Sequence, residues 1–268
     1  MPTALALRLI PEADLPRDQT SGRSAHGLVF DLLRRAHPET AKAIHTANIK
    51  PFTVAPMLDG DGTRPHVFPA GIPAWLRVGV LDDDLYRLLL TNDPAGGSVH
   101  LGDTPVTMSG WTVSGEGAAF DTGTESYAAL CGGNGDIPDS VRLQFITPTA
   151  ISQGEANLPL PVPAKLWAGY ATRWRKFAPA YPLPEDFDEG TGRWLRLSDF
   201  HIKPRRWRYH FGKGFQTHTG FTGWTEITLD HRASEPFARA FHALARYSFY
   251  CGSGMKTTMG MGQTRVEG

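Results

Sequence analysis

Cysteine is nearly absent from this sequence, since only Cys131 and Cys251 occur among its 268 residues. They lie 120 positions apart, which excludes a disulfide framework or a CxxC metal knuckle, and we expect two buried thiols. No apolar run approaches the roughly 18 residues that a membrane-spanning helix needs. The first residues, MPTALALRLIPEADLPRD, reach acid and proline too soon for a signal peptide. We therefore expect a globular, cytoplasmic protein with no membrane partner.

The sequence also lacks a net charge, because 27 lysines and arginines balance 27 aspartates and glutamates. The balance hides an asymmetry: residues 1–139 hold 10 basic and 17 acidic groups, whereas residues 140–268 hold 17 basic and 10 acidic groups. A basic half of this kind is compatible with a polyanionic partner. Hydrophobic residues make up 41% of the chain, enough for the core of one large domain or two of ordinary size.

The first half alternates strand and helix patterns. An apolar run at 5–10 ends at a proline, as a strand does, and apolar residues three and four apart predict a helix over 21–36. The elements expected next are a short helix at 39–47, strands at 52–57 and 74–81, a helix at 85–90 and one or two strands over 99–113. This order is that of a ferredoxin-like unit with an extra helix.

A connection follows, and the pattern then restarts. Residues 131–139, CGGNGDIPD, have three glycines and no apolar periodicity, so we expect an N-terminal domain at 1–132, a linker at 133–139 and a C-terminal domain at 140–268. The elements expected in the C-terminal domain are a strand at 141–148, a helix at 162–177, hairpin strands at 194–202 and 207–215, a strand at 224–229, a helix at 235–250 and a strand at 263–267. The predicted fold is α+β, with two tandem ferredoxin-like (RRM-like) domains and a hairpin inserted in the second.

Residues 251–262, CGSGMKTTMGMG, form the most specific segment. A phosphate-binding P-loop is excluded because methionine precedes the lysine, and six residues are too few for the helix that must follow. Two interpretations remain: a loop whose bare backbone lies against a nucleic-acid backbone, or a tight turn that allows close packing. The candidate RNA-binding residues here are Gly252, Gly254, Lys256, Thr257, Gly260 and Gly262.

A basic run extends over residues 193–213, with seven lysines and arginines against Asp199 alone. On a strand, Arg206 and Arg208 share one face while Trp207 and Tyr209 share the other. Such a strip suits nucleic-acid phosphates, and the alternative is a solvated edge that prevents aggregation. The candidate RNA-binding residues are Lys203, Arg205, Arg206 and Arg208, with Arg173 and Arg175 in a second basic cluster.

Three histidines, His26, His37 and His45, fall within twenty residues of one another. Their spacing matches no HExxH or other metal-ligand pattern, so we expect no metal site and no cofactor. Imidazole titrates near neutral pH and can both accept and donate a proton, which makes a general acid/base role plausible for one of them. The sequence alone does not choose among the three.

Five segments together resemble the CRISPR-associated protein 6 family, the endoribonucleases that cut CRISPR repeat transcripts into guide RNAs. The segments are AKAIHTANIKPFTV (41–54), LQFITP (143–148), LPLPVPAKLWAGYATRWRKFAP (158–179), FTGWTEITL (221–229) and CGSGMKTTMGMG (251–262). The resemblance implies tandem ferredoxin-like domains, metal-independent cleavage of CRISPR repeat RNA by the 2′-hydroxyl, and a glycine-rich loop that contacts RNA. It also names a CRISPR effector complex and a homodimer as partners to test.

Residue by residue, the family's catalytic histidine matches His45, and its lysine before the Pro-Phe-Thr strand matches Lys50. A tyrosine completes the catalytic set in some members, but this chain has Phe30 there, so His26 or His37 could substitute for it. The expected activity is a sequence- or structure-specific endoribonuclease that leaves a 2′,3′-cyclic phosphate and a 5′-hydroxyl. The alternative is a non-catalytic RNA-binding subunit of an effector complex.

Overall fold

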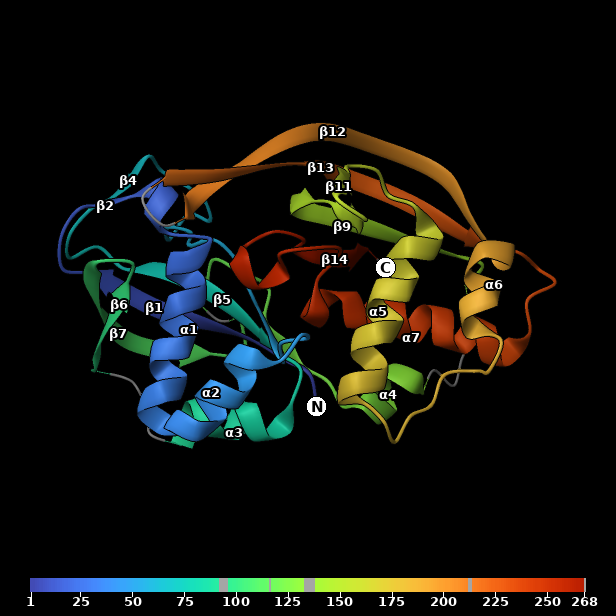
Figure 1. The fold of residues 1–268 in the computed structure, drawn as a ribbon, viewed down its shortest axis with the longest axis horizontal. Coiled ribbons are helices and arrows are strands. Elements are labelled where there is room, and N and C mark those ends of the chain that lie inside the picture. The colour runs from blue at the N-terminus through green and yellow to red at the C-terminus, as the bar shows by residue number, and fades with distance from the viewer. Residues whose placement is uncertain (92–95, 116, 133–137, 212–213, 268) are drawn as a thin grey trace. The chain divides into compact units, whose positions relative to one another are not determined.

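The computed structural model describes residues 1–91, 96–115, 117–132, 138–211 and 214–267 (Figure 1). Residues 133–137 of the expected linker and Lys213 of the basic run therefore lie outside the described residues. The chain divides into two compact units. Unit 1 comprises Met1–Thr124, Arg208–Thr217 and Thr258–Gly260, and unit 2 comprises Glu125–Trp207, His218–Thr257 and Met261–Gly268.

Unit 1 is built on an antiparallel sheet with three helices. Its strands run in the order β3 (Phe52–Val54), β5 (Ala74–Val80), β1 (Thr3–Pro11), β7 (Thr104–Thr112) and β6 (Ser98–Leu101), and β8 (Gly123–Thr124) also pairs with β1. The helices are α1 (Arg23–Ala36), α2 (Pro38–Thr46) and α3 (Asp83–Thr91). Two short strands, β2 (Leu15–Pro16) and β4 (Val67–Phe68), pair beside the 3₁₀ turn η1 (Arg17–Gln19).

The core of unit 1 lies between the sheet and α1. Alternate residues of β1, among them Leu5, Leu7 and Leu9, are buried in one cluster with Leu28 and Leu33 of α1. Both periodicities were visible in the sequence, because strand side chains alternate with period two and helix side chains with period 3.6. This packing fixes the axis of α1, which carries His26 and Phe30.

Unit 2 repeats the same plan. Its sheet runs in the order β12 (Leu195–Phe211), β13 (Gly214–Leu229), β9 (Ser140–Thr149) and β14 (Thr264–Glu267), and the residues of β12 and β13 between 208 and 217 belong to unit 1. Its remaining elements are α4 (Tyr127–Cys131), β10 (Ile151–Gln153), β11 (Ala156–Leu158), α5 (Pro163–Phe177), α6 (Phe187–Trp194) and α7 (Glu235–Cys251). The 3₁₀ turn η2 (Thr257–Met259) begins in unit 2, and its last two residues belong to unit 1. Numbered within each repeat, the ferredoxin-like strands stand in the order 2-3-1-4 in both sheets. The predicted fold class is therefore confirmed.

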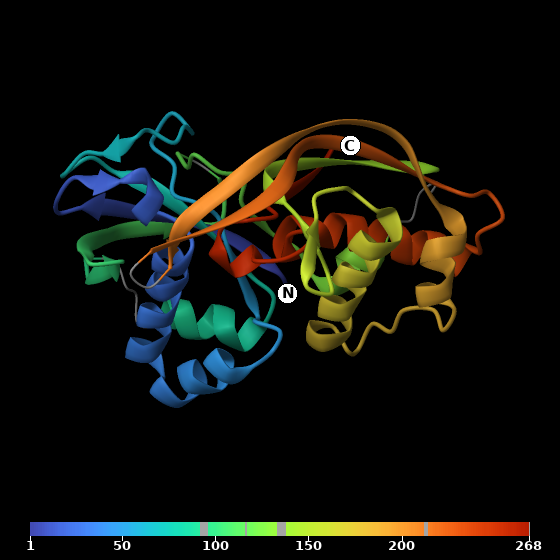
Figure 2. The same cartoon turned by 45° about the horizontal axis from the view of Figure 1, so that its top comes forward.

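The predicted inserted hairpin is wrong. Residues 194–202 and 207–215 do not pair with each other as two strands: β12 runs unbroken from Leu195 to Phe211, and its partner β13 continues to Leu229 through the strand predicted at 224–229. The hairpin is thus the second and third strand of the ferredoxin-like repeat itself (Figures 1 and 2). Pro204 lies within β12, and because β12 is an edge strand its missing N–H is tolerated.

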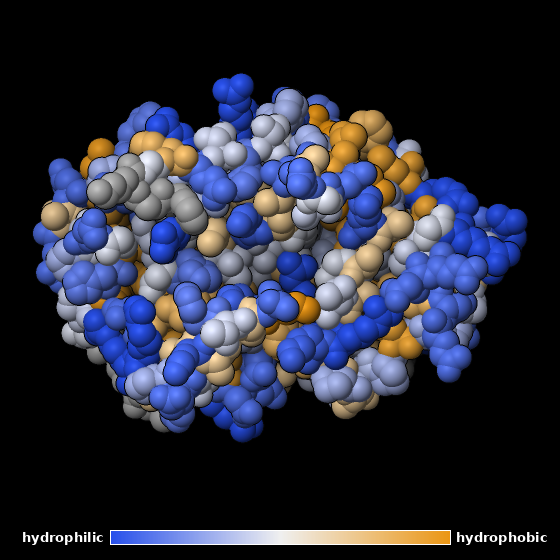
Figure 3. Space-filling view, in the orientation of Figure 1, coloured by the Kyte–Doolittle hydropathy of each residue, from blue (hydrophilic) through white to orange (hydrophobic). Residues whose placement is uncertain are grey.

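Two further features concern surface and thiols. Cys251 is buried as expected, but Cys131 is half-buried, and neither is in a disulfide. Hydrophilic residues cover most of the face drawn in Figure 3. Within the described part of the chain, no helix is both long and apolar enough to cross a bilayer.

Candidate active site

The two ends of α2 carry histidines in different situations. At the start, His37 is the N-cap, with its Nδ1 accepting the Thr40 backbone N–H at 3.2 Å and lying 2.9 Å from the Thr40 hydroxyl. Pro38 follows at the first helical position, where its lack of an N–H costs nothing. The Nδ1 atom of His37 is therefore engaged in holding the helix start.

At the other end of α2, His45 lies in the last turn with an exposed side chain. Its ring meets the buried Phe30 ring of α1 edge-on, with centroids 5.3 Å apart and an interplanar angle of 82°. Edge-to-face contact of this kind is a favourable aromatic geometry. Phe30 thus holds one side of the His45 ring while the other side stays open to solvent.

Lys50 lies beside the same helix end. Its Nζ donates to the carbonyl oxygens of His45, at 2.7 Å, and Ala47, at 2.5 Å. The last carbonyls of a helix have no partner inside the helix and favour a nearby cation. An ammonium has three N–H groups, so two are used here and the third can meet another acceptor. Partial burial lowers the pKa of Lys50.

His26 lies one helical turn before Phe30 on α1, with ring centroids 4.8 Å apart. Its Nδ1 is 3.2 Å from the Thr258 carbonyl oxygen, which can only accept, so Nδ1 carries the proton and Nε2 is the acceptor. Burial lowers the pKa of His26 to about 4, against the opposing effect of that hydrogen bond, and Lys50, His45 and Arg23 lower it further. His26 is therefore a neutral imidazole at neutral pH.

Phe30 stands between the two imidazoles. It contacts His26 on one side and His45 on the other, and its ring also meets Phe52 at 5.6 Å. Without a hydroxyl it cannot exchange protons, so its role in the cluster is to hold two histidine rings at defined positions. Sequence reasoning proposed His26 from its spacing to Phe30, but it had no signal for the backbone carbonyl of Thr258.

The tip of the glycine-rich loop (residues 252–262) completes this cluster. The Gly22 N–H, just before α1, donates to the Met259 carbonyl at 3.0 Å. Gly22 has φ +64°, and a Cβ there would lie 2.5 Å from the side chain of the buried Tyr209. Glycine is thus required where the start of α1 meets the end of the β12–β13 hairpin. These contacts, all within unit 1, set the environment of His26.

The rest of the glycine-rich loop packs closely within unit 2. A Cβ on Gly254 would lie 2.2 Å from the Ala150 carbonyl oxygen, and one on Gly262 would lie 2.0 Å from that of Ser253. Both have φ near +70°, as has Gly252, and Gly260 has φ +96°. These values support the packing interpretation for Gly254 and Gly262. Thr257 is buried, whereas Lys256 is half-exposed.

The two arginines of the second basic cluster each have a partner within the protein. Arg173 donates to the Gly254 carbonyl at 3.0 Å and lies 3.5 Å from the Thr257 hydroxyl, so it supports the glycine-rich loop. Arg175 forms an ion pair with Asp188 of α6 at 3.0 Å. Arg173 is half-buried, whereas Arg175 is exposed, so its ion pair with Asp188 leaves the Arg175 guanidinium open to solvent.

The basic strip, defined as Lys203, Arg205, Arg206 and Arg208 on β12, has all four side chains exposed. Trp207 and Tyr209 are buried, with 6% and 0% exposure, as the predicted alternation requires. The Arg208 guanidinium lies over the Phe215 ring, 3.7 Å from its centroid. The strip therefore presents cations along one edge strand.

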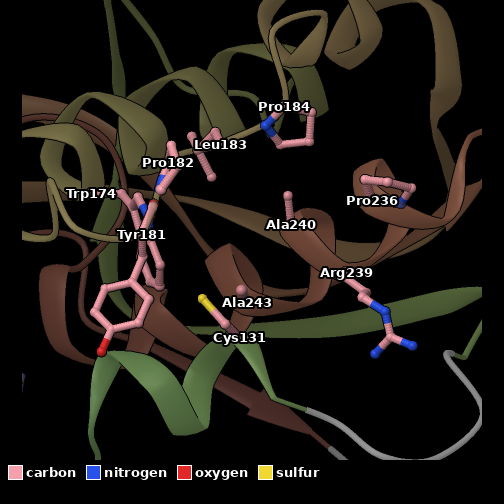
Figure 4. A pocket seen from close by; sticks show the side chains of 10 residues that line it. All are labelled: Cys131, Trp174, Tyr181, Pro182, Leu183, Pro184, Pro236, Arg239, Ala240 and Ala243. Carbon is pink, nitrogen blue, oxygen red and sulfur yellow. The ribbon is translucent and has the colours of Figure 1, made fainter.

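A pocket of about 350 Å³ lies elsewhere in unit 2, lined by residues of α4, α5, α7 and the segment 181–184 (Figure 4). Its lining is apolar apart from the Cys131 thiol, whose pKa is raised by burial, and Arg239, which pairs with Glu235. An apolar pocket of this kind does not suit a phosphodiester. Among the described residues, no three His, Cys, Asp or Glu side chains are grouped to hold a metal ion.

Two protein-family models match most of the chain. The family model for the CRISPR Cas6 N-terminal domain matches residues 1–111, and that for the CRISPR-associated endoribonuclease Cas6 matches residues 143–264. A Cas6 endoribonuclease of Mycobacterium tuberculosis (strain CDC 1551 / Oshkosh) is 30% identical over 126 residues, which cover 47% of this chain. The match spans 38% of that relative's length.

Solved Cas6 structures are similar to this protein over the whole chain. A Thermus thermophilus Cas6 product complex is similar with a TM-score of 0.81 and 29% identity, covering 100% of this chain and 99% of that one. A second Cas6 product complex has a TM-score of 0.77 and 26% identity, also covering 100% and 99%. With both family models in chain order and the shared fold, the chain belongs to the Cas6 family.

Proposed function

We propose that this protein is an endoribonuclease that cuts CRISPR repeat RNA without a metal ion, by attack of a 2′-hydroxyl on the adjacent phosphodiester. The observation that carries the proposal is the His45 end of α2, where an exposed imidazole on Phe30 lies beside the Lys50 ammonium. Membership of the Cas6 family supports an RNA substrate. The products are a 2′,3′-cyclic phosphate and a 5′-hydroxyl.

The reaction needs a base, an acid and a cation. His26 is neutral with Nε2 as its acceptor, so it is available to accept the 2′-hydroxyl proton, although its low pKa makes it a weak base. His45 then donates a proton to the departing 5′-oxygen, and the third N–H of Lys50 offsets the negative charge of the phosphorane. His37 is not assigned a role, because its Nδ1 already caps α2.

Acid/base groups alone are insufficient for a fast reaction. General acid/base catalysis typically contributes about 10²- to 10⁴-fold, so the remaining acceleration comes from in-line positioning of the scissile phosphate by bound RNA. The exposed basic strip and Lys256 are the residues that we propose hold the RNA backbone. Arg173, Gly254 and Gly262 act on RNA only by shaping the glycine-rich loop.

The proposal assigns different work to the two halves of the chain. We propose a domain at 1–132 that supplies His26, His45 and Lys50, and a domain at 140–268 that supplies the basic strip and the glycine-rich loop. CRISPR repeat RNA is the proposed partner. Association with a CRISPR effector complex or with a second copy of the chain is a separate question, which the mass of the purified protein with and without RNA addresses.

Cleavage of a labelled repeat RNA in EDTA tests the proposal directly. We expect a single cut that leaves a 2′,3′-cyclic phosphate, identified by its resistance to phosphatase until acid opens the ring. A repeat with a 2′-deoxy group at the nucleotide before the cut should bind normally and stay intact, because its internal nucleophile is missing. Strict dependence on added magnesium would contradict the mechanism.

A non-catalytic RNA-binding subunit is the second candidate. This candidate is favoured by Phe30, because some family members have a tyrosine at that position and phenylalanine has no hydroxyl. The same experiment separates the two: this candidate predicts tight binding of the repeat with no cut at any pH between 6 and 9, with or without magnesium.

A further inference from the structure

The glycine-rich loop, the β10–β11 hairpin and β13 lie next to one another in unit 2. The Met255 N–H donates to the Ala150 carbonyl at 2.8 Å, and Ala150 immediately precedes β10. This bond places Lys256 next to the base of the β10–β11 hairpin. The third element is β13, which contributes His218. All these residues belong to the same compact unit.

Asn157 of β11 and His218 form a hydrogen-bonded pair. The Asn157 side-chain Nδ2 lies 3.2 Å from His218 Nδ1, so the amide donates and the imidazole nitrogen accepts. Burial lowers the pKa of His218, and the Lys256 charge lowers it further, which favours the neutral imidazole. Because the Asn157 Nδ2 can only donate, Nδ1 is then the nitrogen without a proton. His218 is 9% exposed, whereas Asn157 is exposed. A buried imidazole therefore sets the orientation of a surface amide.

That orientation leaves a defined set of polar atoms for a ligand. One Nδ2 hydrogen of Asn157 is used by His218, so the other hydrogen and Oδ1 remain. They form one donor beside one acceptor when His218 takes the hydrogen that points away from Oδ1. Adenine presents the complement, an N6 amino donor beside the N7 acceptor, and an asparagine amide pairs with these two atoms. Guanine presents two acceptors at the same positions and does not fit.

Lys256 adds a cation in an uncommon backbone conformation. Among the described residues it is the one non-glycine residue with positive φ, at +57°. Side chains rarely adopt this conformation, and where they do the surrounding structure enforces it, often at a functional site. Two backbone hydrogen bonds hold this conformation. The N–H of the preceding residue, Met255, donates to Ala150, and the Lys256 carbonyl accepts the Met261 N–H at 3.3 Å.

We propose that Asn157, oriented by His218, reads one adenine of the bound repeat RNA while Lys256 holds a neighbouring phosphate. This inference rests on the proposed function and names a base-specificity residue for it. Ser152 is paired with Asn157 in the hairpin and shares its face, whereas Gln153 and Ala156 are paired and face the other way. Glu155 is the one acidic side chain of this hairpin.

The test is a binding panel. Each adenine of the repeat is changed singly to guanine, every RNA carries the 2′-deoxy block at the cut site, and affinity is measured by fluorescence anisotropy. The wild-type protein should lose affinity about 5-fold or more at one adenine position, the lower end for an amide that reads a base. Asn157→Ala should bind the parental repeat that much more weakly and show no discrimination at that position.

Companion variants separate reading from positioning and from general attraction. Lys256→Ala should weaken all repeats equally and lower the salt slope by about 0.7 to 0.9, because it removes a phosphate contact. His218→Leu should reproduce Asn157→Ala, and His218→Gln, whose Oε1 can accept from Asn157, should restore discrimination. Gln153→Ala, on the other face of the hairpin, is the matched control and should behave as wild type.

The outcomes distinguish the inference from the function. If the wild-type protein binds no repeat RNA, the proposed function fails. If it binds and cuts the repeat, but Asn157→Ala keeps the full pattern of discrimination, the specificity assignment is overturned and the function stands. Asn157 is exposed, so its replacement does not endanger folding. If His218→Leu fails to fold, His218→Gln and Asn157→Ala still decide the matter.

Discussion

The two histidines at the ends of α2 show how one residue type serves two purposes in a single helix. His37 turns its Nδ1 back to the Thr40 N–H, and its imidazole is part of the helix start. His45, eight residues later, rests its ring on Phe30 and stays exposed beside the Lys50 ammonium. A side chain engaged with its own backbone stabilises the fold, whereas one held by packing alone keeps its nitrogens for a substrate.

The largest effect expected from this comparison is at His45. His45→Ala should lower the single-turnover cleavage rate at saturating protein by about 10² to 10⁴-fold, the range for an acid/base group. RNA affinity should change little, because the imidazole moves a proton in the transition state and does not hold the ground state.

His37→Ala is the matched control for that measurement. It removes the same kind of side chain from the same helix and should cleave at close to the parental rate. Parental cleavage by His45→Ala, or loss of cleavage in His37→Ala with the fold intact, would contradict the assignment of His45 as catalytic and His37 as structural. It would also reopen the choice among the three histidines.

The next effect is at Lys50. Lys50→Met keeps the length of the side chain but removes the charge, and it should slow cleavage by about 10²-fold, the lower end for one donor to a developing oxyanion. Lys50→Arg keeps a cation near the His45 and Ala47 carbonyls and should recover part of the rate. If Lys50→Met lowers thermal stability while cleavage at low temperature is unchanged, Lys50 only caps α2.

Much of the fold could be predicted from the sequence, and the errors have local causes. The β1 and α1 patterns were clear because both elements bury one face on a common core. The hairpin was misjudged because Pro204 and the exposed residues around it interrupt the period of two in β12. An edge strand that extends beyond its sheet buries few side chains, so its sequence carries little periodic signal.

The site was predicted as residues but not as an arrangement. His45 and Lys50 were proposed, and the structure brings them to the same helix end, yet the pattern could not distinguish His26 from His37. That distinction depends on one backbone carbonyl, Thr258, contributed from 232 positions away. Arg173 was proposed for RNA because its charge is visible in the sequence, whereas its hydrogen bond to Gly254 is not.

Arg206 and Arg173 offer a similar comparison between a residue that binds RNA and one that supports the fold. The expected effect of Arg206 on affinity is a few-fold. Arg206→Ala should weaken repeat binding and make its salt dependence shallower by about 0.7 to 0.9, the value for one lost phosphate contact. Cleavage at saturating protein should persist. Arg173→Ala should instead lower the melting temperature, because the glycine-rich loop loses its support. Equal salt slopes for Arg206→Ala and wild type would mark the basic strip as a solvated edge.

His26 should make stability depend on pH. Burial lowers the pKa of His26 to about 4 in the folded chain from 6.5 in the unfolded chain, so the unfolded state binds the proton more readily between these values. The stabilising contribution is complete above pH 6.5 and is lost as the pH falls towards 4. Urea unfolding of wild type should therefore show a stability that declines over this window more steeply than that of His26→Gln. Parallel curves would contradict the neutral, buried assignment.

The smallest effect expected is at His37, and it concerns stability. His37→Ala removes the acceptor for the Thr40 N–H at the start of α2, and loss of an N-cap costs about 0.5–2 kcal/mol. We expect about 0.5 kcal/mol, because His37 is exposed and water can replace part of the bond. His37→Asn, a good N-cap, should restore the free energy of unfolding or exceed it, whereas no substitution at His45 should be rescued in cleavage by a better cap. If His37→Asn restores stability but cleavage falls in both His37 variants, the start of α2 also contributes to RNA positioning. Both ends of α2 would then contribute to cleavage, and His37 and His45 would differ only in how much.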